Sequence, residues 1–167
     1  MMLKLKNILF TESLIGPVYH GSSEDIKEFD FDKAKEFGIH FGTKQSASHR
    51  GETKNNKKFF LKKYNLLINK PLHLDDVFGW SLESVLENML KNNIISFEKY
   101  KTDLENLKRK ALEISKVTGL SFRNAKNNAL KKYLLDLGYD GIVYDNKGEA
   151  GGTAYIVFDG SQVKEIN

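Results

Sequence analysis

The sequence contains no cysteine, only two prolines and no long hydrophobic run. Without cysteine the chain can form neither disulfide bonds nor thiolate metal sites, and nothing requires an oxidising compartment. No apolar stretch approaches the roughly 20 residues that a bilayer-spanning helix needs. The opening MMLKLKNILF is interrupted by Lys4 and Lys6 and lacks a small-residue cleavage site, so it does not resemble a signal peptide. We therefore expect a cytoplasmic protein with no membrane partner.

The composition is that of a folded protein of one domain. The 167 residues are 40% hydrophobic and 29% charged, which suits a single hydrophobic core. We expect an N-terminal arm over residues 1–14 and one domain over residues 15–167. The net charge of +4 is modest, and part of it lies in the stretch KNNKKFFLKK from Lys54 to Lys63. Two interpretations of this stretch stay open: a solvated loop leading into a strand, or a patch that contacts phosphates or nucleic acid.

The order of local patterns predicts an α+β protein. Strand-like segments occupy residues 16–21, 38–43 and 58–69, with Pro71 ending the third. Ser81 and Ser121 are expected to cap helices, a further helix is expected over residues 97–117, and Gly138 should stop the last one. Strand patterns return at residues 140–146 and 154–160. Residues 80–137 therefore form a helical insert between two groups of strands.

Apolar residues recur three and four positions apart in the insert, as expected for helix faces that pack into a core. We assign these residues no chemistry. They are Leu82, Val85, Leu86, Met89 and Leu90 in the first helix, Tyr100, Leu104, Leu107, Ala111 and Ile114 in the second, and Ala125, Leu130, Tyr133, Leu134 and Leu137 in the third.

Two of the four histidines lie in similar surroundings. The segments PVYHGS, around His20, and FGIHFGT, around His40, each place a histidine beside a glycine and an aromatic residue in a predicted strand. The other two are His49 and His73. No pair has the spacing of zinc ligands on one helix, and phosphate-loop and nucleophile-elbow motifs are absent from the sequence.

Four segments, in order, resemble the ADP-ribosyltransferase superfamily, especially the small domains of phage and mobile-element polyvalent proteins. They are VYHGSSEDIKEFDFDKA, GIHFGT, LLINKPLHLDD and LGYDGIVYDNKGEAGGTAYIVFDGSQVKEI. The resemblance covers most of residues 17–79 and 133–166. It implies a split core of mixed and antiparallel β-sheet, with the helices as an insert.

The resemblance also implies that the substrate is NAD⁺ and that no metal takes part. His20 would hydrogen-bond a ribose hydroxyl on the adenosine side of NAD⁺, because an imidazole both donates and accepts. The backbone of Gly21 would hold the carboxamide, because glycine lets a ligand approach closely. Further contacts to NAD are expected from Ser22, Phe41, Ser46 and Tyr155.

Two departures from the best-known clade bear on catalysis. His40 stands where that clade has a tyrosine, and Ala154 stands where it has a catalytic glutamate. Cleavage of the nicotinamide–ribose bond develops positive charge, which a carboxylate stabilises. Glu149, in the glycine-rich turn GEAGGT, is the expected replacement. The predicted catalytic residues are therefore His20, His40 and Glu149.

The resemblance implies three alternative functions. The favoured one is a phage-encoded mono-ADP-ribosyltransferase that modifies a host protein, or less readily RNA, in the host cytoplasm. The paired histidines are also similar to the RNA 2′-phosphotransferase clade, which likewise uses NAD. The third function is a catalytically degenerate NAD-binding module or virion-associated protein, which Ala154 favours.

Overall fold

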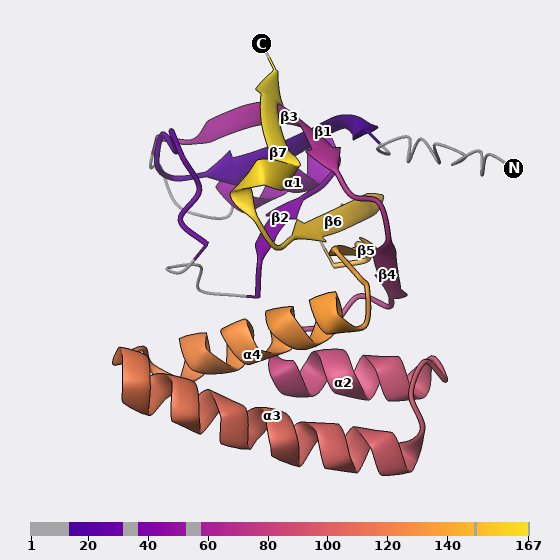
Figure 1. Cartoon of the computed structure of the whole chain (residues 1–167). Coiled ribbons are helices and arrows are strands. Elements are labelled where there is room, and N and C mark those ends of the chain that lie inside the picture. Colours follow the sequence, from indigo (N-terminus) through magenta and orange to yellow (C-terminus); the bar gives the residue numbers. More distant parts are fainter. Residues whose placement is uncertain (1–13, 32–36, 53–57, 149, 167) are drawn as a thin grey trace, which may run out of the picture.

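The computed structural model describes residues 14–31, 37–52, 58–148 and 150–166, and it forms three layers (Figure 1). A three-stranded sheet and a four-stranded sheet make two of them. The third is a layer of helices that lies beneath the four-stranded sheet in Figure 1. This arrangement confirms the α+β class and the split sheet.

The first sheet is antiparallel throughout. Its strands are β1 (Leu14–Ser22), β3 (Phe60–Leu67) and β7 (Val163–Ile166), in the order β1-β3-β7. Leu14, which was assigned to the N-terminal arm, is the first residue of β1. Residues 1–13 lie outside the described part of the chain.

The second sheet is mixed. Its strands are β2 (Ile39–Phe41), β6 (Thr153–Val157), β5 (Gly141–Asp145) and β4 (Pro71–Leu74), in the order β2-β6-β5-β4. Only the β4–β5 pair is parallel. A bridge between Tyr19 of β1 and Gly42, the residue after β2, links the two sheets.

The helices begin where the sequence provides caps. Helix α1 (Lys44–Glu52) follows β2, and the insert contains α2 (Leu82–Lys91), α3 (Phe97–Thr118) and α4 (Phe122–Asp136). The hydroxyls of Ser81 and Ser121 accept backbone N–H groups at the starts of α2 and α4, as predicted. Gly138 adopts a φ of +85° just past the end of α4, a conformation that favours glycine.

Two hydrophobic cores occupy the spaces between layers. One lies between the second sheet and the helices, and it buries Leu86, Met89 and Leu130 completely. The other lies between the sheets, around Tyr64 and Leu66. Strand β6 serves both, because its side chains alternate between the two faces.

Three expectations about the elements were wrong. Leu137 is 37% exposed rather than inward-facing, because α4 has already ended at Asp136. Pro71 begins β4 instead of only ending the strand before it, and β7 was not predicted. Both additional strands are four residues long, too short for an alternating pattern to be recognised.

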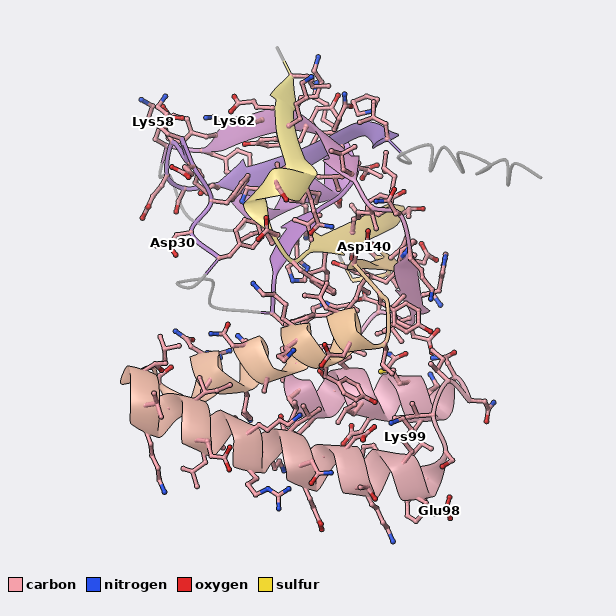
Figure 2. All side chains as sticks on the ribbon, in the orientation of Figure 1. Asp30, Lys58, Lys62, Glu98, Lys99 and Asp140 are labelled. Carbon is pink, nitrogen blue, oxygen red and sulfur yellow. The ribbon has the colours of Figure 1, made fainter. Side chains whose placement is uncertain are left out.

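The charged stretch around Lys62 is partly neutralised. Lys62 Nζ lies 3.0 Å from the Asp25 carboxylate and 3.6 Å from that of Glu165. The hydrogen bond that Lys62 donates to the Asp25 carboxylate raises the pKa of Lys62. Lys58 and Lys62 project from the end of the first sheet (Figure 2), and residues 53–57 lie outside the described part of the chain.

The side chain of Gln162 joins the two sheets at one end. Its oxygen accepts the N–H groups of Phe158, at 2.8 Å, and Asp159, at 3.0 Å. Its nitrogen donates to the carbonyls of Asp140, at 2.6 Å, and Leu67, at 3.2 Å. Leu67 ends β3 in the first sheet, whereas Asp140 precedes β5 in the second. One amide therefore satisfies four backbone groups across the junction.

Replacing Gln162 with leucine should lower the free energy of unfolding by about 2–4 kcal/mol, because several hydrogen bonds worth about 1 kcal/mol each are lost together. Urea denaturation followed by circular dichroism measures this change. Gln45→Leu is the matched control, because Gln45 is exposed on α1. Equal stabilities of the two variants would contradict the assigned role of Gln162.

Candidate functional site

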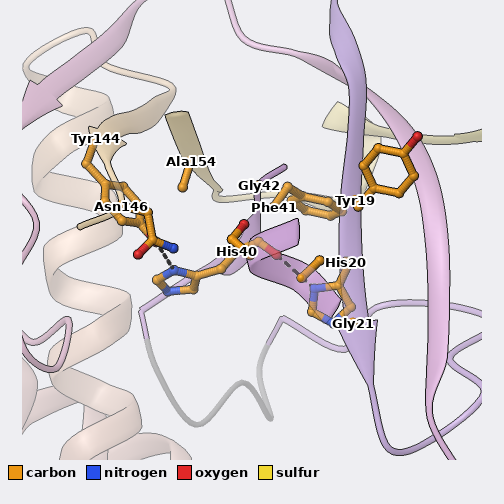
Figure 3. Close-up of a pocket in the computed structure, with 11 residues that line it drawn as sticks. Tyr19, His20, Gly21, His40, Phe41, Gly42, Tyr144, Asn146 and Ala154 are labelled. Atoms are coloured by element: carbon orange, nitrogen blue, oxygen red, sulfur yellow. Dashed lines mark hydrogen bonds between the residues drawn. The ribbon is translucent and has the colours of Figure 1, made fainter. Parts of the chain in front are cut away.

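A recess opens where β1, β2 and β6 meet the start of α1 (Figure 3). It holds about 290 Å³ of empty space, including space open to solvent. Its lining includes His20 and Gly21 from β1, His40 and Phe41 from β2, and Ser46 from α1. The two histidines that the sequence singled out therefore border the same recess.

His20 is oriented by a backbone group of the neighbouring strand. Its Nδ1 atom lies 2.8 Å from the carbonyl oxygen of His40. Because a carbonyl only accepts hydrogen bonds, His20 Nδ1 carries the proton, and Nε2 is the basic nitrogen of the neutral ring. The edge of Phe29 meets the ring, with centroids 5.1 Å apart and planes at 87°.

His40 lies in an aromatic environment. Its Nδ1 is 3.1 Å from the hydroxyl of Tyr144, and its ring centroid is 6.0 Å from that of Trp80. Trp80 and Tyr144 pack against each other at 4.7 Å, and both are buried. The Tyr144 hydroxyl and the Trp80 ring thus restrict how the His40 imidazole can rotate.

The glycines of the recess are required by the packing of the protein itself. A Cβ atom on Gly21 would lie 2.3 Å from the carbonyl oxygen of Ala47 and 2.5 Å from the ring of Phe59. A Cβ on Gly42 would lie 2.6 Å from the Ser46 hydroxyl. A larger residue at Gly21 would push α1 away from the strands, because the blocking oxygen belongs to the backbone of α1.

The start of α1 is fixed at the edge of the recess. The Thr43 hydroxyl accepts the N–H of Ser46 at 3.1 Å, and the Ser46 hydroxyl donates to the Thr43 carbonyl at 3.1 Å. Ser46 is only 4% exposed. This pair of contacts holds the first turn of α1 beside Gly42.

Two predicted NAD contacts do not line the recess. The Ser22 hydroxyl faces its own turn, where it accepts the N–H of Glu24 at 3.1 Å. Tyr155 packs against the core between the sheets, because it alternates with the recess-lining residue Ala154 along β6. Glu149 lies outside the described residues.

Ala154 gives the recess a small, apolar wall. It is 2% exposed, and it lies on β6 opposite Tyr144 of β5. Among the lining residues that the structure describes, none is acidic. A carboxylate that acts in this recess must therefore come from elsewhere in the chain.

Sequence reasoning did not identify Tyr144, Asn146 and Trp80 as residues of the site. Tyr144 and Asn146 line the recess from the end of β5, and Asn146 is only 5% exposed. Alternation along DGIVYDN placed Tyr144 on one face of a strand, but only the strand order brings that face to His40. Trp80 precedes the cap of α2, where nothing in the sequence indicated a contact with β2.

Neither a metal cluster nor a membrane helix is found in the part of the chain that the structure describes. No three histidine, aspartate or glutamate residues there gather as metal ligands. No described helix is sufficiently long and apolar to cross a bilayer.

The split α+β sheet and the strand-borne histidine followed by glycine define an ADP-ribosyltransferase-like domain. Residues 14–167 match the family described as ADP-ribosyltransferase in polyvalent proteins, and the chain belongs to this family. No curated protein matches the sequence significantly. A crystal structure of an anti-CRISPR protein matches with 16% identity and a TM-score of 0.39, covering 92% of this chain and 96% of that one.

Replacing Tyr144 with phenylalanine should remove the hydrogen bond to His40 and keep the packing. We expect a loss of about 0.5–1.5 kcal/mol in the free energy of unfolding. We also expect changed nitrogen chemical shifts for the His40 imidazole, measured by NMR. Tyr19→Phe is the control, because the Tyr19 ring points away from His40 (Figure 3). Unchanged His40 shifts in Tyr144→Phe would show that the hydroxyl does not orient this ring.

Proposed function

We propose that the protein is a phage-encoded, NAD-dependent mono-ADP-ribosyltransferase that modifies a host protein in the host cytoplasm. The observation that carries this proposal is the recess between β1 and β2, where His20, Gly21 and His40 meet in a chain of the ADP-ribosyltransferase family. The recess is open to solvent, and the space counted inside it includes that opening.

The proposed reaction exchanges one bond at the ribose carbon. The bond between this carbon and the nicotinamide nitrogen breaks, and its electron pair stays with nicotinamide. A nucleophile of the acceptor protein then bonds to the same carbon and releases a proton. The transition state has oxocarbenium character, so the site has to orient the ribose and stabilise positive charge.

His20 is proposed to hold NAD through its adenosine-side ribose. Its Nδ1 donates to the His40 carbonyl, so in the neutral ring Nε2 is the nitrogen whose chemistry allows it to accept a hydrogen bond from a ribose hydroxyl. The contacts with Phe29 and Phe41 restrict rotation of the ring. A ring fixed before the substrate arrives loses little entropy on binding.

His40 is proposed to act beside the reacting carbon. Its position between the Tyr144 hydroxyl and Trp80 supports a ring that donates or accepts a hydrogen bond in a partly desolvated site. The positive charge that develops on the ribose requires a carboxylate, and Ala154 cannot provide one. We assign this role to Glu149, from its place in the sequence between Gly148 and the pair Gly151–Gly152.

His20→Ala is expected to weaken NAD binding at least about tenfold, because a hydrogen bond to the substrate and a fixed ring are lost. The melting temperature should change by only a few degrees, because His20 is half-buried at the edge of a recess. Isothermal titration calorimetry and a thermal melt measure the two quantities. The control is His73→Ala, since His73 is exposed on β4. Unchanged NAD affinity with a strongly lowered melting temperature would mean that His20 is only structural.

Glu149→Gln should lower the rate of NAD cleavage by about 100- to 1000-fold, the usual effect of losing a charge stabiliser. NAD affinity should stay within a few-fold of wild type, because the carboxylate acts in the transition state. Release of nicotinamide, followed by chromatography, measures the rate. Glu105→Gln is the control, because Glu105 is exposed on α3.

A second candidate is an RNA 2′-phosphotransferase-like enzyme that also uses NAD. The observation in its favour is that His20, His40 and the small apolar Ala154 border one recess. None of the described lining residues is an arginine, which weighs against it because that clade pairs its histidines with arginines. Phosphate transfer from a 2′-phosphorylated oligoribonucleotide, unaffected by Glu149→Gln, would favour this candidate. NAD binding by the wild type without any turnover would favour the degenerate binding module or virion-associated protein.

A further inference from the structure

The loop between β4 and α2, residues 75–80 with the sequence DDVFGW, packs against two residues that line the recess. At one end of this loop, Trp80 packs against His40 and Tyr144. Near the other end, a carboxylate oxygen of Asp76 accepts the N–H of Lys147 at 3.0 Å and that of Gly148 at 3.2 Å. The loop is therefore tied both to the wall of the recess and to the turn that follows β5.

Side chains of α2 fix the conformation of this loop. The amide of Asn88, which is 5% exposed, donates to the carbonyl of Asp75 at 3.0 Å and accepts its N–H at 3.1 Å. The Ser84 hydroxyl donates to the carbonyl of Gly79 at 2.8 Å. Since both ends are anchored, the residues between them are presented in a defined position.

Phe78 occupies the middle of this anchored loop and is fully exposed, with a relative accessibility of 109%. Gly79, which follows it, has a φ of +78°, a conformation that favours glycine. A single exposed apolar residue is ordinary on a protein surface. An aromatic ring held out by a fixed loop beside a candidate active site is different, because such rings are frequent binding hot spots and a fixed loop loses little entropy on binding.

We propose that the 75–80 loop docks the acceptor protein and that Phe78 inserts into an apolar recess of that acceptor. This inference rests on the proposed transfer of ADP-ribose, and it adds to the transferase a surface for its acceptor. Phe78 is two residues from Trp80, whose ring centroid lies 6.0 Å from that of His40, so an acceptor bound at the loop is brought toward the reacting groups. The NAD-contacting residues and Phe78 are then separate parts of one site.

The charges beside the loop favour a protein acceptor over a nucleic acid. Asp75 and Asp145 line one groove together with Tyr144, and Asp76 lies in the loop itself. Lys91 lies 2.9 Å from Asp75 and offsets its charge. Carboxylates outnumber the neighbouring lysine side chains, Lys91 and Lys147. A polyanion is disfavoured at such a surface, whereas a segment with an apolar side chain and neutral or basic neighbours fits it.

The test compares Phe78→Ser with wild type in two assays. The first measures transfer of label from radiolabelled NAD to proteins of a nuclease-treated bacterial lysate. The second measures hydrolysis of NAD to ADP-ribose and nicotinamide without lysate. We expect at least about a tenfold loss of protein labelling, as for a hot-spot residue, and unchanged hydrolysis. Phe78→Leu, which keeps an apolar side chain, should retain most of the labelling. Phe122→Ser, at an exposed position on α4, is the matched control and should behave as wild type.

Each other outcome is informative. Equal protein labelling by wild type and Phe78→Ser overturns the docking role and leaves the transferase intact. Parallel loss of labelling and hydrolysis in Phe78→Ser also overturns it, because the residue then supports the fold or NAD binding. Label found on nucleic acid of an untreated lysate, and not on protein, overturns the choice of acceptor. A wild type that neither labels protein nor hydrolyses NAD refutes the transferase, and the docking role with it.

Discussion

The contact between β1 and β2 is the constraint on which the site depends. The backbone groups of Tyr19 and Gly42 exchange two hydrogen bonds, of 2.8 and 2.9 Å, and these bonds join the two sheets directly through their main chains. The bond from His20 Nδ1 to the His40 carbonyl lies beside them. Any shift in this register would separate the two imidazoles, because neighbouring residues of a strand face opposite sides of a sheet. The position of the site therefore follows from backbone pairing as much as from side chains.

The sequence was most informative where a local rule applied. Ser81, Ser121 and Gly138 marked helix ends because caps and left-handed turns depend on one or two residues. The helix faces could also be predicted, because their apolar spacing repeats over several turns. The family resemblance anticipated the split sheet and brought His20 and His40 into one hypothesis. The prediction that Leu137 faces inward failed, because the apolar spacing of the sequence continues past Asp136, where the helix ends.

The remaining features depend on contacts between distant segments. Tyr144 reaches His40 across 104 positions of the sequence, and the Gln162 amide reaches Leu67 across 95. Neither residue carries a local signal for its partner. Gly21 is a related case: its sequence context suggested room for a ligand, whereas the backbone of α1 already occupies the space that a Cβ would take. The sequence alone does not show whether a glycine makes room for a ligand or for the backbone of a neighbouring helix.

The helical layer beneath the second sheet carries an excess of positive charge. Residues 97–136, which comprise α3 and α4, contain ten lysines and arginines against five aspartates and glutamates, an excess of five positive charges in a chain whose total is +4. All the other residues together therefore carry a net charge of −1. Such separation gives the molecule a dipole moment, which orients it in the field of a charged partner before contact. A polyanionic surface would meet the helices first and leave the strand-built recess turned toward solvent.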